Sequence, residues 1–455
     1  MGVRTVLLSL LCVQLCAGAA LGERARRYLA ELVRIDSTNP PGNETRAARW
    51  LAGVATEEGI PFELLGPDPD RLNFVARLRG AGGRRPLLLM AHTDVVPAEA
   101  AAWSVPPFAA IERDGYLWGR GALDDKGLLA VQLAVLVELK RRPLKLRRDV
   151  ILLAEADEEG DSAGIRWMLD NASDRLDAEF ALNEGGFITN LPSGRRVYHV
   201  QTAEKVPMRL VLRARGTAGH GSLPLRDNPV VTLSRALVRL ADTEQPVRVN
   251  ALARRYLAAL AELEEHRWLE PLLPRLNRPQ SALMAASAIR ARSPELEAQL
   301  RTSIAPTLLS AGLKVNVIPE TAEAHLDIRR LPEESEKEVL ARIRRAIHDS
   351  AVEILPAPGE RRPAARPSPD DSGAFRAMRE VFLRASPGAL VTPFMQPGAT
   401  DGAYLRRRGM PVYGVPLFAR EPAGSRPHGT DERIALSSLE EGAELLYQIV
   451  AAADR

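Results

Sequence analysis

The chain has 455 residues, more than one hydrophobic core usually organises, so its length predicts two or three domains. Hydrophobic residues make up 45% and charged residues 26%, with 33 glycines and 34 prolines, a composition that excludes wholesale disorder, collagen and coiled coil. The 61 basic and 58 acidic residues give a net charge of +3 without a basic stripe, which argues against nucleic acid or an anionic membrane surface as a partner.

The start of the chain has the pattern of a secretory signal peptide. Arg4 provides a basic beginning, residues 6–15 an apolar stretch, and residues 17–19 a small-residue cleavage site. We therefore expect residues 1–19 to be removed and the protein to be secreted or periplasmic. An uncleaved signal anchor is the alternative, because the apolar stretch approaches the length of a membrane span. Both cysteines lie in this segment, so the exported protein would contain no disulfide.

Helices and short apolar strands alternate in the part of the chain that follows. Helices are predicted over residues 24–33, 45–58 and 127–141. Strands are predicted over residues 72–78, 86–91 and 149–154. Such alternation predicts an α/β domain with a largely parallel sheet.

The middle of the chain predicts a second domain. Strands are expected over residues 206–215, 314–318, 321–329 and 352–355. Helices are expected over residues 228–240, 251–300 and, after a capping box of Ser335 and Glu338, up to residue 347. The order β-α-β-β-α-β with a helical insertion indicates an α+β domain over residues 205–358. It interrupts an α/β domain formed by residues 20–204 and 359–455, with a proline-rich linker near residues 356–369.

Five short motifs carry groups that can bind metals or transfer protons. They are His92-Thr93-Asp94, Asp124-Asp125, Asp157-Glu158-Glu159, Asn183-Glu184 and His428-Gly429-Thr430-Asp431. Each has an ordinary structural explanation by itself, such as a structural histidine, a helix cap or a solvated acidic loop. Several of them follow predicted strands, however, and ligands of open α/β sheets bind outside the carboxyl ends of the strands. Together they supply the histidines and carboxylates that bind two zinc ions with one carboxylate shared.

The order of the motifs resembles a known family. HTDVVP, GRGALDDKG, DEEG, NEGG, GHGSLP, KVNVIP, DIR, GATD and HGTDERI follow one another as in the acetylornithine deacetylase, succinyl-diaminopimelate desuccinylase, aminoacylase and carboxypeptidase S family of dimetal metallopeptidases. Trp103, residues 106–108, residues 114–115 and the long helical insertion are most similar to its carboxypeptidase S and N-fatty-acyl-amino-acid hydrolase/synthase branch. The resemblance implies a zinc-exopeptidase-like α/β catalytic domain with a mixed central sheet, and it makes the inserted domain a lid.

Carried over residue by residue, the resemblance implies a two-metal site. Asp124 would bridge two ions. His92 and Glu184 would complete the ligands of one ion, and Glu159 and His428 those of the other. Glu158 would be the general base that activates water, and Asp94 the partner that orients His92. Two Zn²⁺ per chain are expected, although Co²⁺ or Mn²⁺ suits the same ligands.

Four further positions take roles only through the resemblance. His220 matches a lid histidine that stabilises the oxyanion, often from a partner subunit. Asn316, Arg329 and Gly398 match positions that recognise a substrate carboxylate. The expected partner is therefore a small molecule or short peptide with a free carboxylate, and a homodimer through the lid is one possible assembly.

The resulting hypothesis is an exported dimetal amidohydrolase that cleaves an amide next to a free carboxylate, in N-acyl-amino acids or at the C-terminal residue of short peptides. One residue departs from the branch: Asn183 stands where Asp usually precedes the metal-binding Glu. This loss of charge supports the alternative of a non-catalytic binder of peptides or acyl-amino acids on the same fold. A serine or cysteine hydrolase is disfavoured, because no G-x-S-x-G motif occurs and the cysteines are confined to the leader.

Overall fold

The chain folds into two compact units in the computed structural model, which describes residues 20–142, 145–359, 361–421 and 427–455. Unit 1 contains the chain up to Thr202 together with residues 367–393 and 400–455, and unit 2 contains residues 203–366 and 394–399. The predicted signal peptide, residues 1–19, lies outside the described residues. Among the residues described, no helix has the length and apolar character needed to cross a membrane.

Unit 1 is organised by a sheet with the strand order β1-β2-β6-β3-β7-β17-β9-β16, in which β8 also pairs with β9. The strands are β1 (Phe62–Leu65), β2 (Asn73–Leu78), β3 (Leu87–His92), β6 (Val150–Glu155), β7 (Phe180–Asn183), β8 (Phe187–Asn190), β9 (Arg196–Glu204), β16 (Leu390–Gln396) and β17 (Val412–Gly414). The central pairs β6-β3, β3-β7 and β7-β17 are parallel, whereas β1-β2, β2-β6, β8-β9 and β9-β17 are antiparallel. The sheet is mixed, as the resemblance predicted, and not largely parallel: the short connections after β1 and β8 can join only antiparallel neighbours.

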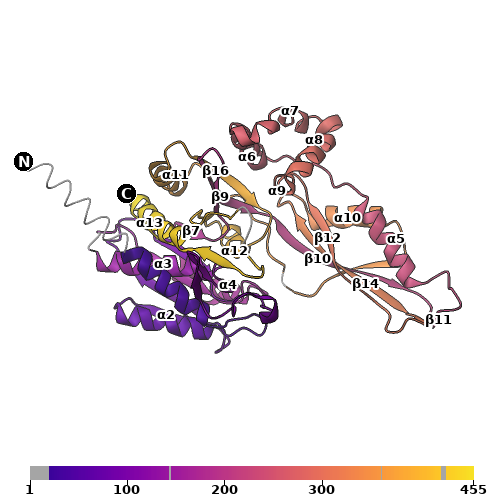
Figure 1. The fold of residues 1–455 in the computed structure, drawn as a ribbon, viewed down its shortest axis with the longest axis horizontal. Coiled ribbons are helices and arrows are strands. Elements are labelled where there is room, and N and C mark those ends of the chain that lie inside the picture. Colours follow the sequence, from indigo (N-terminus) through magenta and orange to yellow (C-terminus); the bar gives the residue numbers. More distant parts are fainter. Residues whose placement is uncertain (1–19, 143–144, 360, 422–426) are drawn as a thin grey trace, which may run out of the picture. The chain divides into compact units, whose positions relative to one another are not determined.

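Helices cover both faces of this sheet because its central strands are apolar on both sides. In β3, Leu87, Leu89 and Ala91 point into the core on one face, while Leu88 and Met90 point into the core on the other. The first face packs against the helix of residues 20–34, α2 (Thr45–Glu57), α3 (Lys126–Arg141), α11 (Gly373–Ala385) and α13 (Leu436–Ala453) (Figure 1). The second packs against α4 (Ala163–Asn171) and α12 (Gly402–Arg407). The predicted α/β architecture of this part is thus confirmed.

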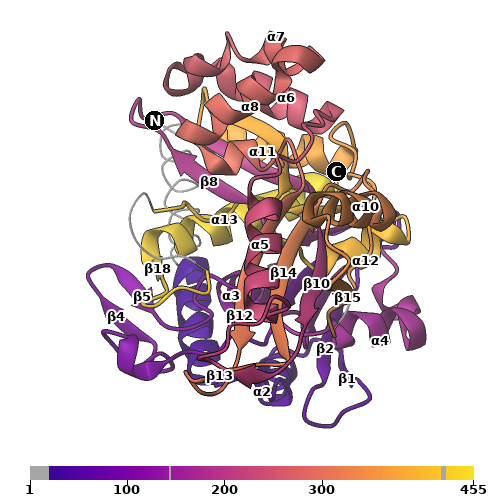
Figure 2. The same ribbon diagram turned by 90° about the vertical axis from the view of Figure 1, so that its right-hand side faces the viewer.

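A small antiparallel sheet joins two distant segments of unit 1. It has the order β18-β5-β4, with β4 (Ile111–Arg113), β5 (Tyr116–Trp118) and β18 (Arg433–Ala435) (Figure 2). Short 3-10 turns span Ala100–Ala102 and Ser173–Leu176. Because Arg433 pairs with Trp118, the residues after β5 lie beside those before β18.

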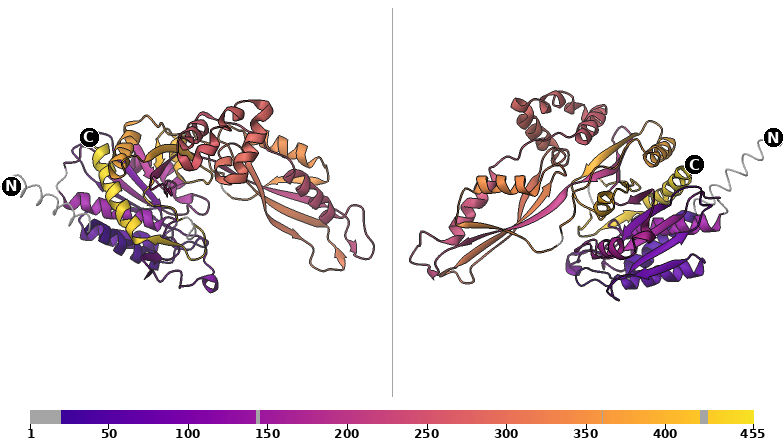
Figure 3. Two further views of the ribbon diagram at one scale, coloured as in Figure 1. Left: turned by 45° about the horizontal axis from the view of Figure 1, so that its top comes forward. Right: turned by 180° about the vertical axis from the view of Figure 1, so that it is seen from behind.

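Unit 2 contains an antiparallel sheet with the order β12-β14-β10-β15, covered by two helices on one face. Its elements are β10 (Val206–Arg215), α5 (Pro229–Ala241), β12 (Ser303–Ala311), β14 (Thr321–Arg330), α10 (Glu336–Ile347) and β15 (Val352–Pro356). Alternate residues of β14 are buried, and they pack under apolar side chains of α5 and α10, which lie on the same side of the strands (Figure 3). The predicted capping box of Ser335 and Glu338 starts α10.

One prediction for unit 2 is wrong. The strand beside β14 is β12, not residues 314–318, of which only β13 (Val317–Ile318) is extended and pairs with β11 (Gly219–His220). β12 escaped detection because nearly all of its residues are exposed, so its sequence does not alternate. The predicted helical stretch 251–300 consists of several short helices, because prolines start new ones within it. It comprises α6 (Ala251–Ala261), a 3-10 turn (Glu264–Leu269), α7 (Leu273–Leu276), α8 (Pro279–Arg292) and α9 (Pro294–Glu297).

Candidate metal centre

The five motifs meet at one edge of the central sheet of unit 1. β6, β3 and β7 are parallel neighbours, so the residues that follow them emerge at the same edge. His92 is the last residue of β3, Glu158 and Glu159 follow β6, and Glu184 follows β7. Asp124 lies just before α3, at a cis peptide bond to Asp125, and His428 lies in the loop before β18.

Asp124 stands between the two histidines. Its Oδ1 is 3.0 Å from His92 Nε2, and its Oδ2 is 3.2 Å from His428 Nε2. His428 Nε2 is also 2.8 Å from Glu159 Oε1. Ligand atoms of His92, Asp124 and Glu159 lie within 4.8 Å of one another, and so do those of His92, Glu158 and Glu184. One carboxylate oxygen facing each histidine is the arrangement that a shared metal ligand needs.

The charges at this edge of the sheet fit divalent cations. Burial and the neighbouring carboxylates of Glu158 and Asp124 raise the pKa of Glu184 well above its usual range. Hydrogen bonds to Asp124 and Glu159 raise the pKa of His428 to about 10. The raised pKa values mean that, without a cation, Glu184 and His428 retain their protons. The proton on Glu184 reduces its repulsion from Glu158 and Asp124, and the proton on His428 pairs with Asp124 and Glu159. Imidazole nitrogens and carboxylate oxygens that release these protons are ligands suited to zinc, cobalt or manganese.

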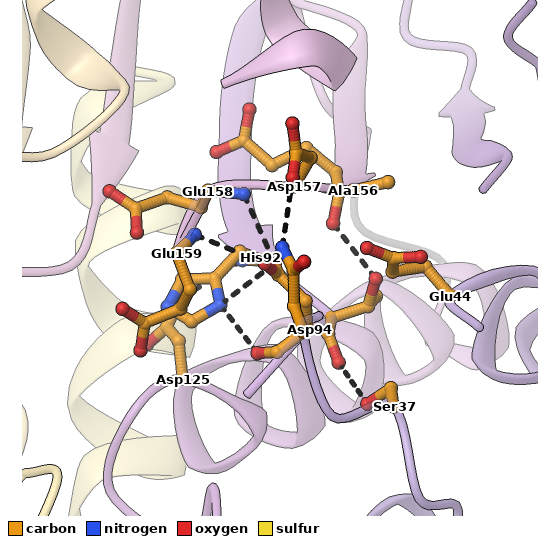
Figure 4. A network of polar contacts seen from close by, with 12 residues as sticks. Ser37, Glu44, His92, Asp94, Asp125, Ala156, Asp157, Glu158 and Glu159 are labelled. Atoms are coloured by element: carbon orange, nitrogen blue, oxygen red, sulfur yellow. Dashed lines mark hydrogen bonds and ion pairs between the residues drawn. The ribbon is translucent and has the colours of Figure 1, made fainter. Parts of the chain in front are cut away.

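Asp94 contacts both His92 and the turn that contains Glu158 and Glu159. The His92 Nδ1 lies 2.9 Å from the backbone oxygen of Asp94, which can only accept, so Nδ1 carries the proton and Nε2 keeps its lone pair toward Asp124. The Asp94 carboxylate accepts the backbone N–H of Glu158 at 3.1 Å and that of Glu159 at 3.0 Å (Figure 4). Asp94 therefore orients His92 through its main chain and, with Oδ1 3.5 Å from the same Nδ1, through its carboxylate, which also holds the turn that carries the expected base and an expected ligand.

Residues that contact Asp94 and Asp157 from outside the five motifs were not predicted from the sequence. Asn39 donates to Asp94 Oδ2 and to Asp157 Oδ1, both at 2.8 Å. Arg71 donates to the same Asp157 oxygen at 2.7 Å and to Glu44 at 2.6 Å. Asp157 has a φ of 67°, a conformation that aspartate tolerates. Asn39 and Arg71 lie far from Asp157 in the chain, so only folding reveals this network. Its one local signal was the conspicuous run of acids after β6.

Asn183 is buried at the end of β7, and its Nδ2 is 3.4 Å from Thr400 Oγ1. Burial, together with repulsion from Asp401 and Glu158, raises the pKa of Glu155 well above its usual range. Thr400 directly precedes Asp401, so an aspartate at position 183 would add charge beside a buried acidic pair. The amide keeps the hydrogen bond without that charge.

The other expected substrate residues belong to unit 2. His220, in β11, is exposed, and its Nδ1 is 2.7 Å from Ser222 Oγ. Asn316 lies beside it, because its carbonyl accepts the N–H of Gly221 at 2.8 Å. Arg329 is near the other end of β14 and pairs with Asp327 at 3.0 Å. Gly398 lies in the separate segment 394–399. Within unit 2, the structure brings His220 and Asn316 together but not Arg329.

Known proteins resemble the chain in sequence and in fold. A model of peptidase family M20/M25/M40 matches residues 88–452. The human N-fatty-acyl-amino acid synthase/hydrolase PM20D1 is 29% identical over 386 residues, 81% of this chain and 74% of the human protein. A probable carboxypeptidase S-like 2 of Dictyostelium discoideum is 26% identical over 383 residues, 80% of this chain and 71% of that protein.

The fold is also that of a solved member of the family. The crystal structure of the M20 family metallo-carboxypeptidase Sso-CP2 from Sulfolobus solfataricus has a TM-score of 0.72 at 20% identity, covering 94% of this chain and 98% of that one. Together with the ordered motifs, a family match over most of the sequence confirms the resemblance. The chain belongs to peptidase family M20/M25/M40, and it is a metal-dependent peptidase or amidohydrolase of that family.

Proposed function

We propose that the protein cleaves an amide bond next to a free carboxylate, in N-acyl-amino acids or at the C-terminal residue of short peptides. The observation that carries the proposal is the position of Asp124, whose two carboxylate oxygens face His92 and His428. The substrate class is supported by the names of the human and Dictyostelium relatives, a fatty-acyl-amino acid synthase/hydrolase and a carboxypeptidase S-like protein.

The proposed mechanism assigns each side chain a task. Asp124 would share two ions, with His92 and Glu184 on one and Glu159 and His428 on the other. Two such ions, when bound, acidify water and polarise the amide carbonyl. Glu158 accepts the proton of the attacking water and returns it to the leaving amine. It suits this task because it is only 5% exposed and its backbone is fixed by Asp94.

The residues of unit 2 complete the proposal. The imidazole of His220 would donate to the oxyanion, and Arg329 would bind the substrate carboxylate with the backbone of Gly398. Asn316, which lies beside His220 and not beside Arg329, would reach the carboxylate from the lid of a partner subunit. The support for these roles is the motif match alone. Replacing Arg329 by Lys should raise KM more than it lowers kcat, because the fork-shaped contact to a carboxylate would be lost in substrate and transition state alike.

We also propose zinc as the native metal, a homodimer and export. The dimer is supported by β12, an edge strand with Leu308 and Leu309 exposed at 62% and 66%, and by the exposed Val231 and Val238 of α5 in the same unit. Sedimentation should give a dimer that Leu308→Lys dissociates. Export rests on residues 1–19 and is tested by the N-terminal sequence of protein recovered outside the producing cell.

The decisive experiment combines metal analysis with turnover. The purified protein is assayed for Zn²⁺, Co²⁺ and Mn²⁺, and for hydrolysis of acetyl-, long-chain-acyl- and dipeptidyl-amino acids with and without chelator. We expect about two ions per chain and chelator-sensitive release of an amino acid. Glu158→Gln should retain the metal and lose turnover. Metal binding without turnover of any substrate would instead support the binder alternative.

A further inference from the structure

Glu432 has no role in the proposed mechanism, yet its carboxylate is fully buried and accepts four N–H groups from the loop of residues 120–124. Oε2 accepts Arg120 Nη1 at 2.6 Å and the backbone N–H of Gly121 at 3.1 Å. Oε1 accepts the backbone N–H of Leu123 at 2.7 Å and that of Asp124 at 3.1 Å. Four donors converge on one carboxylate, which is the number of acceptor sites that it has.

Arg120 and Glu432 also connect this loop to the loop that carries His428. Arg120 Nη2 donates to the backbone oxygen of His428 at 3.3 Å. The N–H of Gly119 donates to the backbone oxygen of Glu432 at 2.9 Å, and the pairing of β18 with β5 continues this connection. Arg120 is 3% exposed and lies over the ring of Trp103, so its guanidinium cannot turn away toward water.

Neither expected ligand is held by regular structure, although Ser104 donates to Asp431 in the His428 loop at 2.7 Å and Arg120 N donates to Pro107 O at 2.8 Å. Asp124 lies outside regular structure, Gly121 has a φ of 85°, and His428 has a φ of 62° with a side chain that is 53% exposed. The distance between Asp124 and His428 therefore depends on what fixes the two backbones. Glu432 holds the backbone of Asp124 directly, and it holds the backbone of His428 through Arg120.

We propose that Glu432, acting with Arg120, is a positioning residue that holds Asp124 and His428 at the spacing required to share a metal ion. The inference rests on the proposed function, because it takes both residues as metal ligands. A carboxylate is needed at this position since all four of its partners are donors. Glutamine would turn an NH₂ group toward two of them and leave N–H groups buried without an acceptor.

The test measures metal retention and turnover in matched variants. Wild type, Glu432→Gln and Glu138→Gln are loaded with Co²⁺, and the metal is withdrawn with a competing chelator while the visible spectrum is followed. Glu138 is the control: it forms a buried ion pair with Arg24 at 2.7 Å in the same unit but does not touch the metal loops. The urea unfolding of each metal-free variant is recorded to measure the general loss of stability.

We expect Glu432→Gln to lose at least one Co²⁺ at a chelator concentration about 10- to 100-fold lower than wild type, with an altered spectrum, whereas Glu138→Gln retains its metal like wild type. kcat should fall while KM changes by less than about twofold. A wild-type release curve for Glu432→Gln, or an equal change in Glu138→Gln, would overturn the inference. If Glu432→Gln does not fold, Arg120→Lys is decisive, because the single nitrogen of lysine cannot occupy both positions from which Arg120 Nη1 reaches Glu432 and Nη2 reaches His428; unchanged release would then refute the proposal.

Failure of the proposed function would look different. Wild-type protein that binds two Co²⁺ but hydrolyses none of the substrates would reject the amidohydrolase, while the release curves would still decide the role of Glu432.

Discussion

Replacing one carboxylate oxygen of Asp94 by an NH₂ group, in Asp94→Asn, tests whether the hydrogen bonds of this side chain support catalysis. Its carboxylate accepts the backbone N–H groups of Glu158 and Glu159 and the side-chain N–H of Asn39. In Asp94→Asn, the amide oxygen can keep the two donors on Oδ2, but the NH₂ group must then face the N–H of Glu158 and, at the longer distance of 3.5 Å, Nδ1 of His92.

The expected magnitude follows from that single loss. A buried N–H left without its charged acceptor costs about 2 kcal/mol, which corresponds to about 30-fold in an equilibrium or rate constant. The cost falls on the backbone of Glu158, the expected general base, so the turn should shift and kcat should fall by about 30-fold or more. KM should change little, because no substrate contact is assigned to this turn.

The assay is steady-state hydrolysis by metal-loaded enzyme, with metal content measured in the same samples. Asp149→Asn is the control: Asp149 accepts the N–H of Gly80 at 2.9 Å and pairs with Arg79 at 3.0 Å, at the opposite end of β6 from the site. It should lose stability without losing kcat. Asp94→Asn with the kcat of wild type would refute the reasoning, since the turn would then keep its place without this hydrogen bond.

Three further predictions concern metal, charge and pH. Chelation should abolish hydrolysis, and added Zn²⁺ or Co²⁺ should restore it; activity that survives complete removal of metal would contradict the site. Asn183→Asp should lower the free energy of unfolding at pH 7 by about 1–3 kcal/mol in urea titrations, because it buries a charge near Asp401; a more stable variant would contradict this account of Asn183. Burial lowers the pKa of Lys205 to about 8, so between pH 8 and about 10.4 the unfolded chain binds more protons and stability should rise with pH, by at most about 3 kcal/mol. Lys205→Met should remove this rise, and an unchanged slope would reject the assignment.

The local pattern of the sequence was sufficient to find the five motifs that meet at one edge of the sheet, and the resemblance supplied the roles proposed for their side chains. His92 ends β3 and Glu159 follows β6, two strands with long apolar runs, and both strands are buried on both faces because helices cover the sheet. Parallel neighbours bring such strand ends together, so chain order alone predicted one site. The capping box of α10 was predicted for the same reason, since its two residues are only three positions apart.

Elements whose place depends on distant partners were missed. β12 is held by its backbone pairing with β14 while its own side chains are exposed, so its sequence carries no alternation to detect. Asn39, Arg71 and Arg120 looked like ordinary loop residues, although each donates to a buried carboxylate distant in sequence.

The sequence by itself therefore determined the fold class and the family, and it predicted the metal-binding groups, because strand periodicity and ordered motifs are properties of short segments. Only the tertiary structure decided how those groups are held. Asp94 meets Glu158 and Glu159, and Glu432 meets the Asp124 loop, through hydrogen bonds between segments that folding alone brings within about 3 Å. Such contacts leave no trace in a local pattern, since a buried carboxylate can be satisfied by donors from any part of the chain.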